Sequence, residues 1–221
     1  MGRTRIAAVA FTFVLVVSAA QAQIRITEWE YNGTGTSTAG EFVELMNVGN
    51  APVSMTGWSY DDSSRTAGSF SLGVFGTVQP KEIMILTEAT EADFRAKWNL
   101  LPAAVKVIGG NTQNLSRADE INIYDNGNGL IDRLTYDDQL PAGMPSIRTN
   151  GISGNPLTLA ALGANDKFQW KLSVVADSYG SYTSTEGNLG NPGRFALIPE
   201  PGSLVLLLVG LAGLAGGRRS R

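Results

Sequence analysis

The chain has 221 residues, of which 17 are basic and 20 acidic, for a net charge of −3, and it contains neither cysteine nor histidine. Without imidazole or thiolate groups, a Ser-His-Asp triad, a cysteine nucleophile and a zinc site are excluded, which leaves carboxylate, hydroxyl or lysine chemistry. An acidic chain without a Lys/Arg cluster also lacks the charge that binding to nucleic acid needs.

Residues 1–22 have the order of a secretory signal peptide. Arg3 and Arg5 form a positive start, residues 6–17 are apolar, and Ala20-Gln21-Ala22 fits the small-x-small pattern of a cleavage site. The apolar run is shorter than the roughly 20 residues of a membrane-spanning helix. We therefore expect export, with cleavage after Ala22.

Short apolar runs separated by polar turns predict strands over the next 65 residues or so. Residues 24–31 alternate apolar and polar side chains but slip in phase once near Glu28, which indicates a strand with a β-bulge. Further strands are predicted at residues 41–47, 53–58, 70–75 and 83–86. Trp58 is expected to be an aromatic side chain of the core.

One helix interrupts this pattern. Thr90 is a suitable N-cap with Asp93 three residues later, and Phe94 and Trp98 are four residues apart on one helical face, so a helix is predicted to about Asn99. Strands are predicted again at residues 105–108, 120–124 and 130–136. The expected fold is all-β, an antiparallel sandwich with one short helix.

Several of these segments resemble the lamin-tail domain (LTD) family. The similar segments are Arg25-Ile26-Thr27-Glu28, Glu41-Phe42-Val43-Glu44-Leu45-Met46-Asn47, Gly57-Trp58, Asp119-Glu120-Ile121 and Asp132-Arg133-Leu134-Thr135-Tyr136. The resemblance covers residues 23–138 and implies an immunoglobulin-like β-sandwich without a catalytic centre of its own. In this comparison the helix around Phe94 is an insertion.

Carboxylates are the candidate catalytic groups. Glu28, Glu30, Glu41 and Glu44 could form the carboxylate pair of a glycosidase, but we favour solvated strand positions or edge charges that prevent sheet aggregation. The segment 150–154 has a serine between glycines but neither the spacing of a nucleophile elbow nor a histidine to activate it. No catalytic residue is assigned.

The loop Asp125-Asn126-Gly127-Asn128-Gly129, with Asp132 beyond it, offers oxygen ligands of the kind that calcium prefers. Asp125, Asn126, Asn128 and Asp132 are therefore candidate ligands. The spacing does not fit an EF-hand loop, and both Asn-Gly pairs are typical of tight hairpins. We favour a hairpin and expect no metal and no cofactor.

Residues 139–198 form an extension rich in Gly, Asn and Ser, in which only residues 168–172 with Val174 and Val175 predict a strand. It could lie at the edge of the sandwich or wrap around it. The turn-rich stretch 187–193 predicts a flexible or irregular spacer before the C-terminal segment. The asparagines of two glycosylation sequons, Asn32 and Asn114, are noted without assigning them a role.

Residues 199–221 resemble a PEP-CTERM sorting signal. Pro199-Glu200-Pro201 is followed by an uncharged apolar run over residues 203–217 and then by three arginines, Arg218, Arg219 and Arg221. The run would span about 22 Å as a helix, less than the roughly 30 Å of a bilayer core. The resemblance implies a transient inner-membrane anchor that an exosortase recognises in bacteria.

The chain between the two end segments carries 12 basic and 19 acidic residues. We expect an exported, non-enzymatic surface or matrix protein that is processed by an exosortase-type enzyme and binds extracellular polysaccharide or a matrix protein. One alternative is a carboxylate-dependent or calcium-assisted hydrolase of extracellular polysaccharide. The other is a tail-anchored periplasmic structural spacer.

Overall fold

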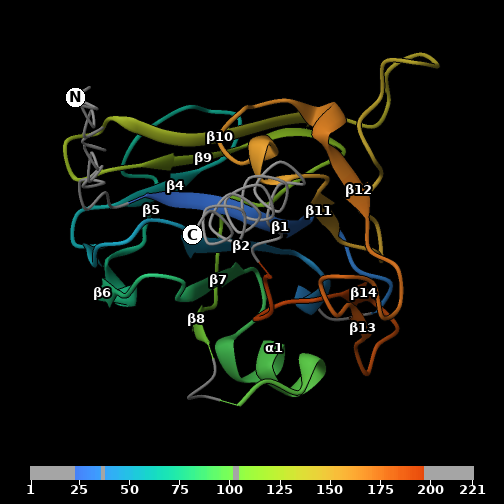
Figure 1. The fold of residues 1–221 in the computed structure, drawn as a ribbon, viewed down its shortest axis with the longest axis horizontal. Helices are drawn as coiled ribbons and strands as arrows, with labels where there is room; N and C mark the ends of the chain where they lie inside the picture. Colours follow the sequence, from blue (N-terminus) through green and yellow to red (C-terminus); the bar gives the residue numbers. More distant parts are fainter. Residues whose placement is uncertain (1–22, 36–37, 102–104, 197–221) are drawn as a thin grey trace, which may run out of the picture.

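The computed structural model describes residues 23–35, 38–101 and 105–196, and in this part of the chain two β-sheets pack face to face (Figure 1). The larger sheet has the order β12-β11-β1-β2-β7-β8, with β1 (Ile24–Glu30), β2 (Phe42–Asn47), β7 (Ile83–Thr87), β8 (Lys106–Ile108), β11 (Gly154–Pro156) and β12 (Trp170–Leu172). The smaller sheet has the order β10-β9-β4-β5, with β4 (Ser59–Asp61), β5 (Phe70–Ser71), β9 (Ala118–Tyr124) and β10 (Leu130–Asp137). This architecture is consistent with the predicted immunoglobulin-like sandwich.

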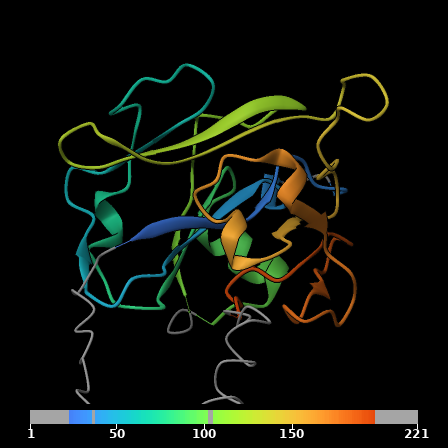
Figure 2. The ribbon, with the colours of Figure 1, turned by 45° about the horizontal axis from the view of Figure 1, so that its top comes forward.

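Shorter elements connect and border the sheets. Two small ribbons are formed by β3 (Val53–Ser54) with β6 (Thr77–Val78) and by β13 (Tyr182–Thr183) with β14 (Leu189–Gly190). Four 3-10 turns are described, namely η1 (Thr38–Gly40), η2 (Gly73–Phe75), η3 (Leu159–Ala161) and η4 (Lys167–Gln169). The predicted hairpin is confirmed as β9–β10, which Figure 2 shows lying across the larger sheet.

The main hydrophobic core lies between the sheets. Alternate residues of β1 and β2 point into it and meet side chains of β9 and β10. The rings of Trp29 and Tyr136 lie 4.0 Å apart and are 1% and 2% exposed. Each aliphatic side chain that is fully buried in this core, such as Ile26 or Leu45, contributes roughly 1.5–3 kcal/mol to the stability of the fold.

The predicted bulge in β1 is confirmed. The pairing register of β1 with β2 shifts between Ile26 and Glu28. Before the shift, Ile24 and Ile26 face the core, and after it Trp29 does so. The bulge is thus the reason that one strand can change the phase of its alternation and still bury both apolar sets.

The expectation of a purely antiparallel sandwich is wrong at one edge. β8 pairs with β7 in parallel, and α1 (Glu91–Trp98) lies in the connection between them. Parallel neighbours need such a crossover, because the chain must return to the end at which the first strand began. The insertion that contains the helix therefore adds an edge strand to the larger sheet.

The helix α1 begins and ends as predicted. The Thr90 side chain accepts a hydrogen bond from the Asp93 backbone N–H, and Asn99 ends the helix in the left-handed conformation. Phe94 and Trp98 are buried against Phe42 of β2, with ring centroids 5.6 and 5.7 Å from the Phe42 ring. A second core thus covers the outer face of the larger sheet.

The strand predicted at residues 53–58 is interrupted. β3 ends at Ser54, a turn closed by the hydrogen bond from Trp58 N–H to Met55 O follows, and β4 begins only at Ser59. Gly57 has φ of +80° in this turn, a conformation that glycine adopts without strain. Trp58 packs against the main core but is only partly buried.

The extension is part of the folded body. β11 pairs with β1 and β12 pairs with β11, so the larger sheet continues into it. The predicted strand is confirmed for residues 170–172 only, because Phe168 lies in η4 and Val174 and Val175 are exposed. The expectation of a spacer is wrong for residues 187–193, where Asn188 and Asn191 are fully buried.

Candidate functional site

The four glutamates that were expected to face water are buried. Glu28, Glu30 and Glu44 are 0% exposed and Glu41 is 7% exposed. The sequence alternation places Glu28, Glu30 and Glu44 on the outer face of the larger sheet as predicted. The prediction was wrong because α1 and the extension cover this face.

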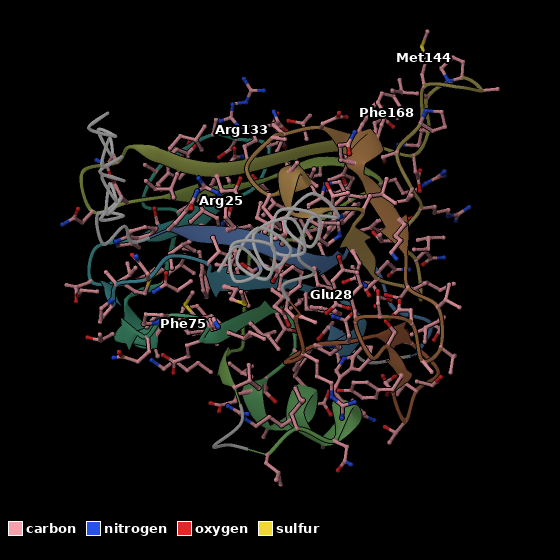
Figure 3. All side chains as sticks on the ribbon, viewed as in Figure 1. Arg25, Glu28, Phe75, Arg133, Met144 and Phe168 are labelled. Atoms are coloured by element: carbon pink, nitrogen blue, oxygen red, sulfur yellow. The ribbon has the colours of Figure 1, made fainter. Side chains whose placement is uncertain are left out.

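Glu28 and Glu44 form a pair directly opposite each other on β1 and β2. The Thr27 hydroxyl donates to Glu44 Oε1 at 2.7 Å, and the Gly193 backbone N–H donates to Glu44 Oε2 at 2.7 Å. Glu28 Oε1 accepts from the Ser153 hydroxyl and, at 2.7 Å, from the Asn191 backbone N–H. Figure 3 shows Glu28 beside the part of the chain that carries β14.

A polar network surrounds this pair. The hydroxyl oxygens of Ser153 and Ser173 lie 2.8 Å apart, and the Asn155 amide donates at 2.7 Å both to Ser173 and to Asn191 Oδ1. The extension is therefore held on the sheet by hydrogen bonds to buried polar groups in addition to the apolar core. Glu28 Oε2 and both carboxyl oxygens of Glu30 have no hydrogen-bond partner within the described residues.

Burial keeps these carboxyl groups protonated to a higher pH than usual. Burial raises the pKa of Glu44 to about 7 and that of Glu41 to about 8. Burial, followed by the charge of Glu44, raises the pKa of Glu28 well above its ordinary value, and burial with the charge of Glu28 does the same for Glu30. The low dielectric of the interior disfavours the ionised forms.

This arrangement does not favour the glycosidase interpretation. A pair of catalytic carboxylates has to reach the bond between two sugar units. The segment that includes Asn191 and Gly193 covers Glu28 and Glu44, so a polymer has no access to them. Ser153 lies in the segment that was rejected as a nucleophile elbow, and its hydroxyl group donates a hydrogen bond to Glu28.

The candidate calcium ligands do not gather at one point. Asp125 Oδ1 accepts hydrogen bonds from the Gly127 and Gly129 backbone N–H groups at 2.8 Å, which closes the hairpin. Asn128 takes φ of +64° within this turn. Asp132 is buried and accepts from the Ile26 backbone N–H at 2.9 Å and from Arg133 N–H at 2.8 Å. Within the described ranges, no group of three Asp or Glu residues is placed to hold a metal ion.

An open polar groove of about 460 Å³, the arginine groove, lies at one end of the sandwich. It is lined by residues 31–32, Glu41, residues 114–117, Arg148 and Asn150. This groove was not predicted from the sequence, although the asparagines of both sequons, Asn32 and Asn114, line it. No single sequence motif marks the groove, because four separate segments form it.

One buried carboxylate organises the arginine groove. The Asp138 side chain, 1% exposed, accepts from the Tyr31 hydroxyl at 2.9 Å and from Arg117 Nε at 2.7 Å, and Arg148 Nε lies 3.7 Å away. The two arginine side chains are 43% and 58% exposed. At the floor, Glu41 Oε1 accepts from the Leu115 backbone N–H at 2.9 Å.

The predicted signal peptide, with Ala20 and Ala22, and the sorting motif Pro199-Glu200-Pro201 lie outside the described residues. In the part of the chain that the structure does describe, no helix has the length and apolar character to cross a membrane.

Comparison with known proteins identifies one family. The model of the Lamin Tail Domain family matches residues 17–138, which is more than half of the chain. A search of curated proteins finds no match. The matched region ends at Asp138, before β11 and β12.

Proposed function

The chain belongs to the lamin tail domain family, and from this premise we propose that it is a non-enzymatic structural or binding module that is exported to the cell surface or extracellular matrix. The domain is immunoglobulin-like and is not typical of enzymes. The observation that carries the proposal is the burial of Glu28 and Glu44, the best candidates for catalytic groups, beneath the extension.

The two ends of the sequence support the localisation. Residues 1–22 have the pattern of a cleaved export signal, and residues 199–221 resemble a PEP-CTERM sorting tail. In this proposal the tail anchors the chain transiently in the bacterial inner membrane until an exosortase-type enzyme processes it. The body then joins the surface or the matrix, where its partner is polysaccharide or a matrix protein.

The experiment compares the full chain in a host with an exosortase and in one without it. Intact mass and cell fractionation report whether residues beyond Pro199-Glu200-Pro201 are lost and where the body goes. We expect loss of the tail and release or surface display only in the host with exosortase. Replacing the three motif residues by alanine should abolish processing, whereas Pro141→Ala, at an exposed loop position, should leave it unchanged.

Two outcomes would overturn this proposal. An intact product held in the membrane in both hosts would make the protein a tail-anchored periplasmic spacer. A product that retains residues 1–22 and stays in the cytoplasmic fraction would remove export altogether.

A further inference from the structure

We propose that the arginine groove is a binding site for an acidic polysaccharide, in which Arg117 and Arg148 bind the carboxylates of the sugar units. This inference rests on the proposed function, because it names the ligand class of the binding module. The volume of the arginine groove, about 460 Å³, lies within the roughly 300–1,000 Å³ that is usual for small-ligand sites.

The guanidinium groups are both positioned and available. Arg117 Nε donates a hydrogen bond to Asp138 at 2.7 Å, and Arg148 Nε lies 3.7 Å from the same carboxylate, so the two guanidinium groups lie close to each other. Within the described residues, the terminal nitrogens of Arg117 have no hydrogen-bond partner, and Arg148 lies at ion-pair distance from Asp138 and near the Tyr31 hydroxyl. A guanidinium presents a rigid fork of donors that matches a carboxylate.

The local charge favours an anion although the chain as a whole is acidic. Arg117 and Arg148 both approach the Asp138 carboxylate, and burial raises the pKa of Glu41 to about 8, so Glu41 adds little negative charge at pH 7. Charges further away are screened over roughly 8 Å at physiological salt. Asp138 and Asp119, which accepts from the Ser116 backbone N–H, are buried, whereas the two guanidinium groups are exposed, so the charges that face a ligand are those of the arginines.

The remaining lining favours a sugar over a peptide. The side-chain amides of Asn32, Asn114 and Asn150 line the groove. Asn32 Nδ2 donates to Asn150 Oδ1, and the remaining amide groups can pair with sugar hydroxyl groups as donors and acceptors. The apolar lining residues, Tyr31 and Leu115, are only 5% and 7% exposed. The groove thus lacks the apolar pocket in which a protein partner usually anchors an aromatic or aliphatic side chain.

The test is calorimetric titration of the full protein, as recovered from the producing cells, with tetragalacturonate at about 0.15 M salt. We expect saturable binding that Arg148→Gln weakens at least tenfold. This variant leaves Asp138 with Tyr31 and Arg117 as partners, so the fold is expected to persist, and the thermal midpoint checks this. The matched control is Arg65→Gln, because Arg65 is similarly exposed and also pairs with a carboxylate, Glu120, but lies outside the groove.

Two further probes separate charge from shape. The methyl ester of the same oligosaccharide keeps the rings and removes the carboxylates, so its affinity should fall at least tenfold. Tetraglutamate keeps the charge and lacks the sugar, and it should bind at least tenfold more weakly. Equal binding of tetraglutamate, equal weakening by Arg65→Gln, or absence of binding would overturn the inference.

The failure of this inference is distinguishable from that of the proposed function. Titration of purified protein does not depend on export or tail processing. If the tail is processed but the oligosaccharide does not bind, the proposed sorting stands and the groove is not the binding site. If the oligosaccharide binds but the tail is not processed, the groove remains the binding site and the proposed sorting is wrong.

Discussion

Glu28 and Glu44 face each other across β1 and β2 with no solvent exposure, and the extension covers both. Glu28 accepts the backbone N–H of Asn191, and Glu44 accepts that of Gly193. The carboxyl pair therefore joins the β-sandwich of the family to a segment that follows the matched region by some fifty residues.

Stability should decrease as the pH rises from about 5 to about 8. The raised pKa values of Glu28, Glu41 and Glu44 mean that the folded state holds protons that the unfolded state releases near pH 4.5. For each of these groups, the free energy of unfolding falls by about 1.4 kcal/mol per pH unit between the pKa of the unfolded state and that of the folded state. The lowered pKa of Glu120, about 2, acts below this window and does not offset the loss. Urea unfolding at pH 5, 7 and 8.5 measures the trend, and a rise in stability over this range would contradict it.

Glu28→Gln should make the protein more stable than the wild type at pH 8.5, by roughly 1–3 kcal/mol, because the buried site no longer has to hold a charge. Glutamine keeps the Oε1 acceptor for Ser153 and Asn191 and places its amide where Oε2 has no partner. At pH 5 the two proteins should differ little. The control Glu91→Gln removes the charge of a half-exposed carboxylate that pairs with Arg95 on the helix, and it should change stability by less than about 0.5 kcal/mol at either pH. If the free energy of unfolding changes equally with pH in the wild type and in Glu28→Gln, the raised pKa of Glu28 is refuted.

Asp132→Ala should destabilise the fold by about 1–3 kcal/mol, because the buried Ile26 N–H at the β1 bulge loses its acceptor. Asp125→Ala should cost less, since water can reach the exposed turn that Asp125 closes. Thermal unfolding of both variants provides the comparison.

Millimolar calcium should leave the midpoint of thermal unfolding of the wild type unchanged. A ligand at 100 times its dissociation constant would stabilise the folded state by about 2.7 kcal/mol. The Asp125 carboxylate accepts a hydrogen bond from the Gly129 backbone N–H within the turn. The Asp132 carboxylate accepts hydrogen bonds from the backbone N–H groups of Ile26 and Arg133. A calcium-dependent increase that Asp125→Ala abolishes would restore the calcium alternative.

A chain that ends at Asp138 should fail to fold, whereas one that ends at Ala196 should fold. The shorter chain lacks β11, β12 and the buried Trp170, and it exposes the carboxyl pair on the sheet surface. Removing a core tryptophan side chain alone costs roughly 3–5 kcal/mol, a large part of the 5–15 kcal/mol that stabilises a typical domain. Circular dichroism and proteolysis of residues 23–138 and 23–196 distinguish the two cases, and a cooperative transition in the shorter fragment would contradict this expectation.

Features that depend on neighbouring residues could be predicted from the sequence. The bulge near Glu28 appears as a phase slip in the alternation, and the helix start appears as Thr90 with Asp93 three residues later. The hairpin at Asp125 follows from its Asn-Gly pairs. Each of these signals acts within a few residues, where backbone sterics and local hydrogen bonds dominate.

Tertiary structure decided which polar faces are covered. Alternation places Glu28 and Glu44 on one side of a sheet, but their burial depends on chain segments some 150 residues away. The parallel edge strand β8 and the arginine groove likewise depend on the path of the chain between distant segments. The sequence by itself determined the long strands, the bulge, the helix and the acidic, cysteine-free character of the chain, but not the breaks after Ser54 and Ser71. Packing of the extension decided the rest, because the burial of a carboxyl group and its pKa depend on what lies against it.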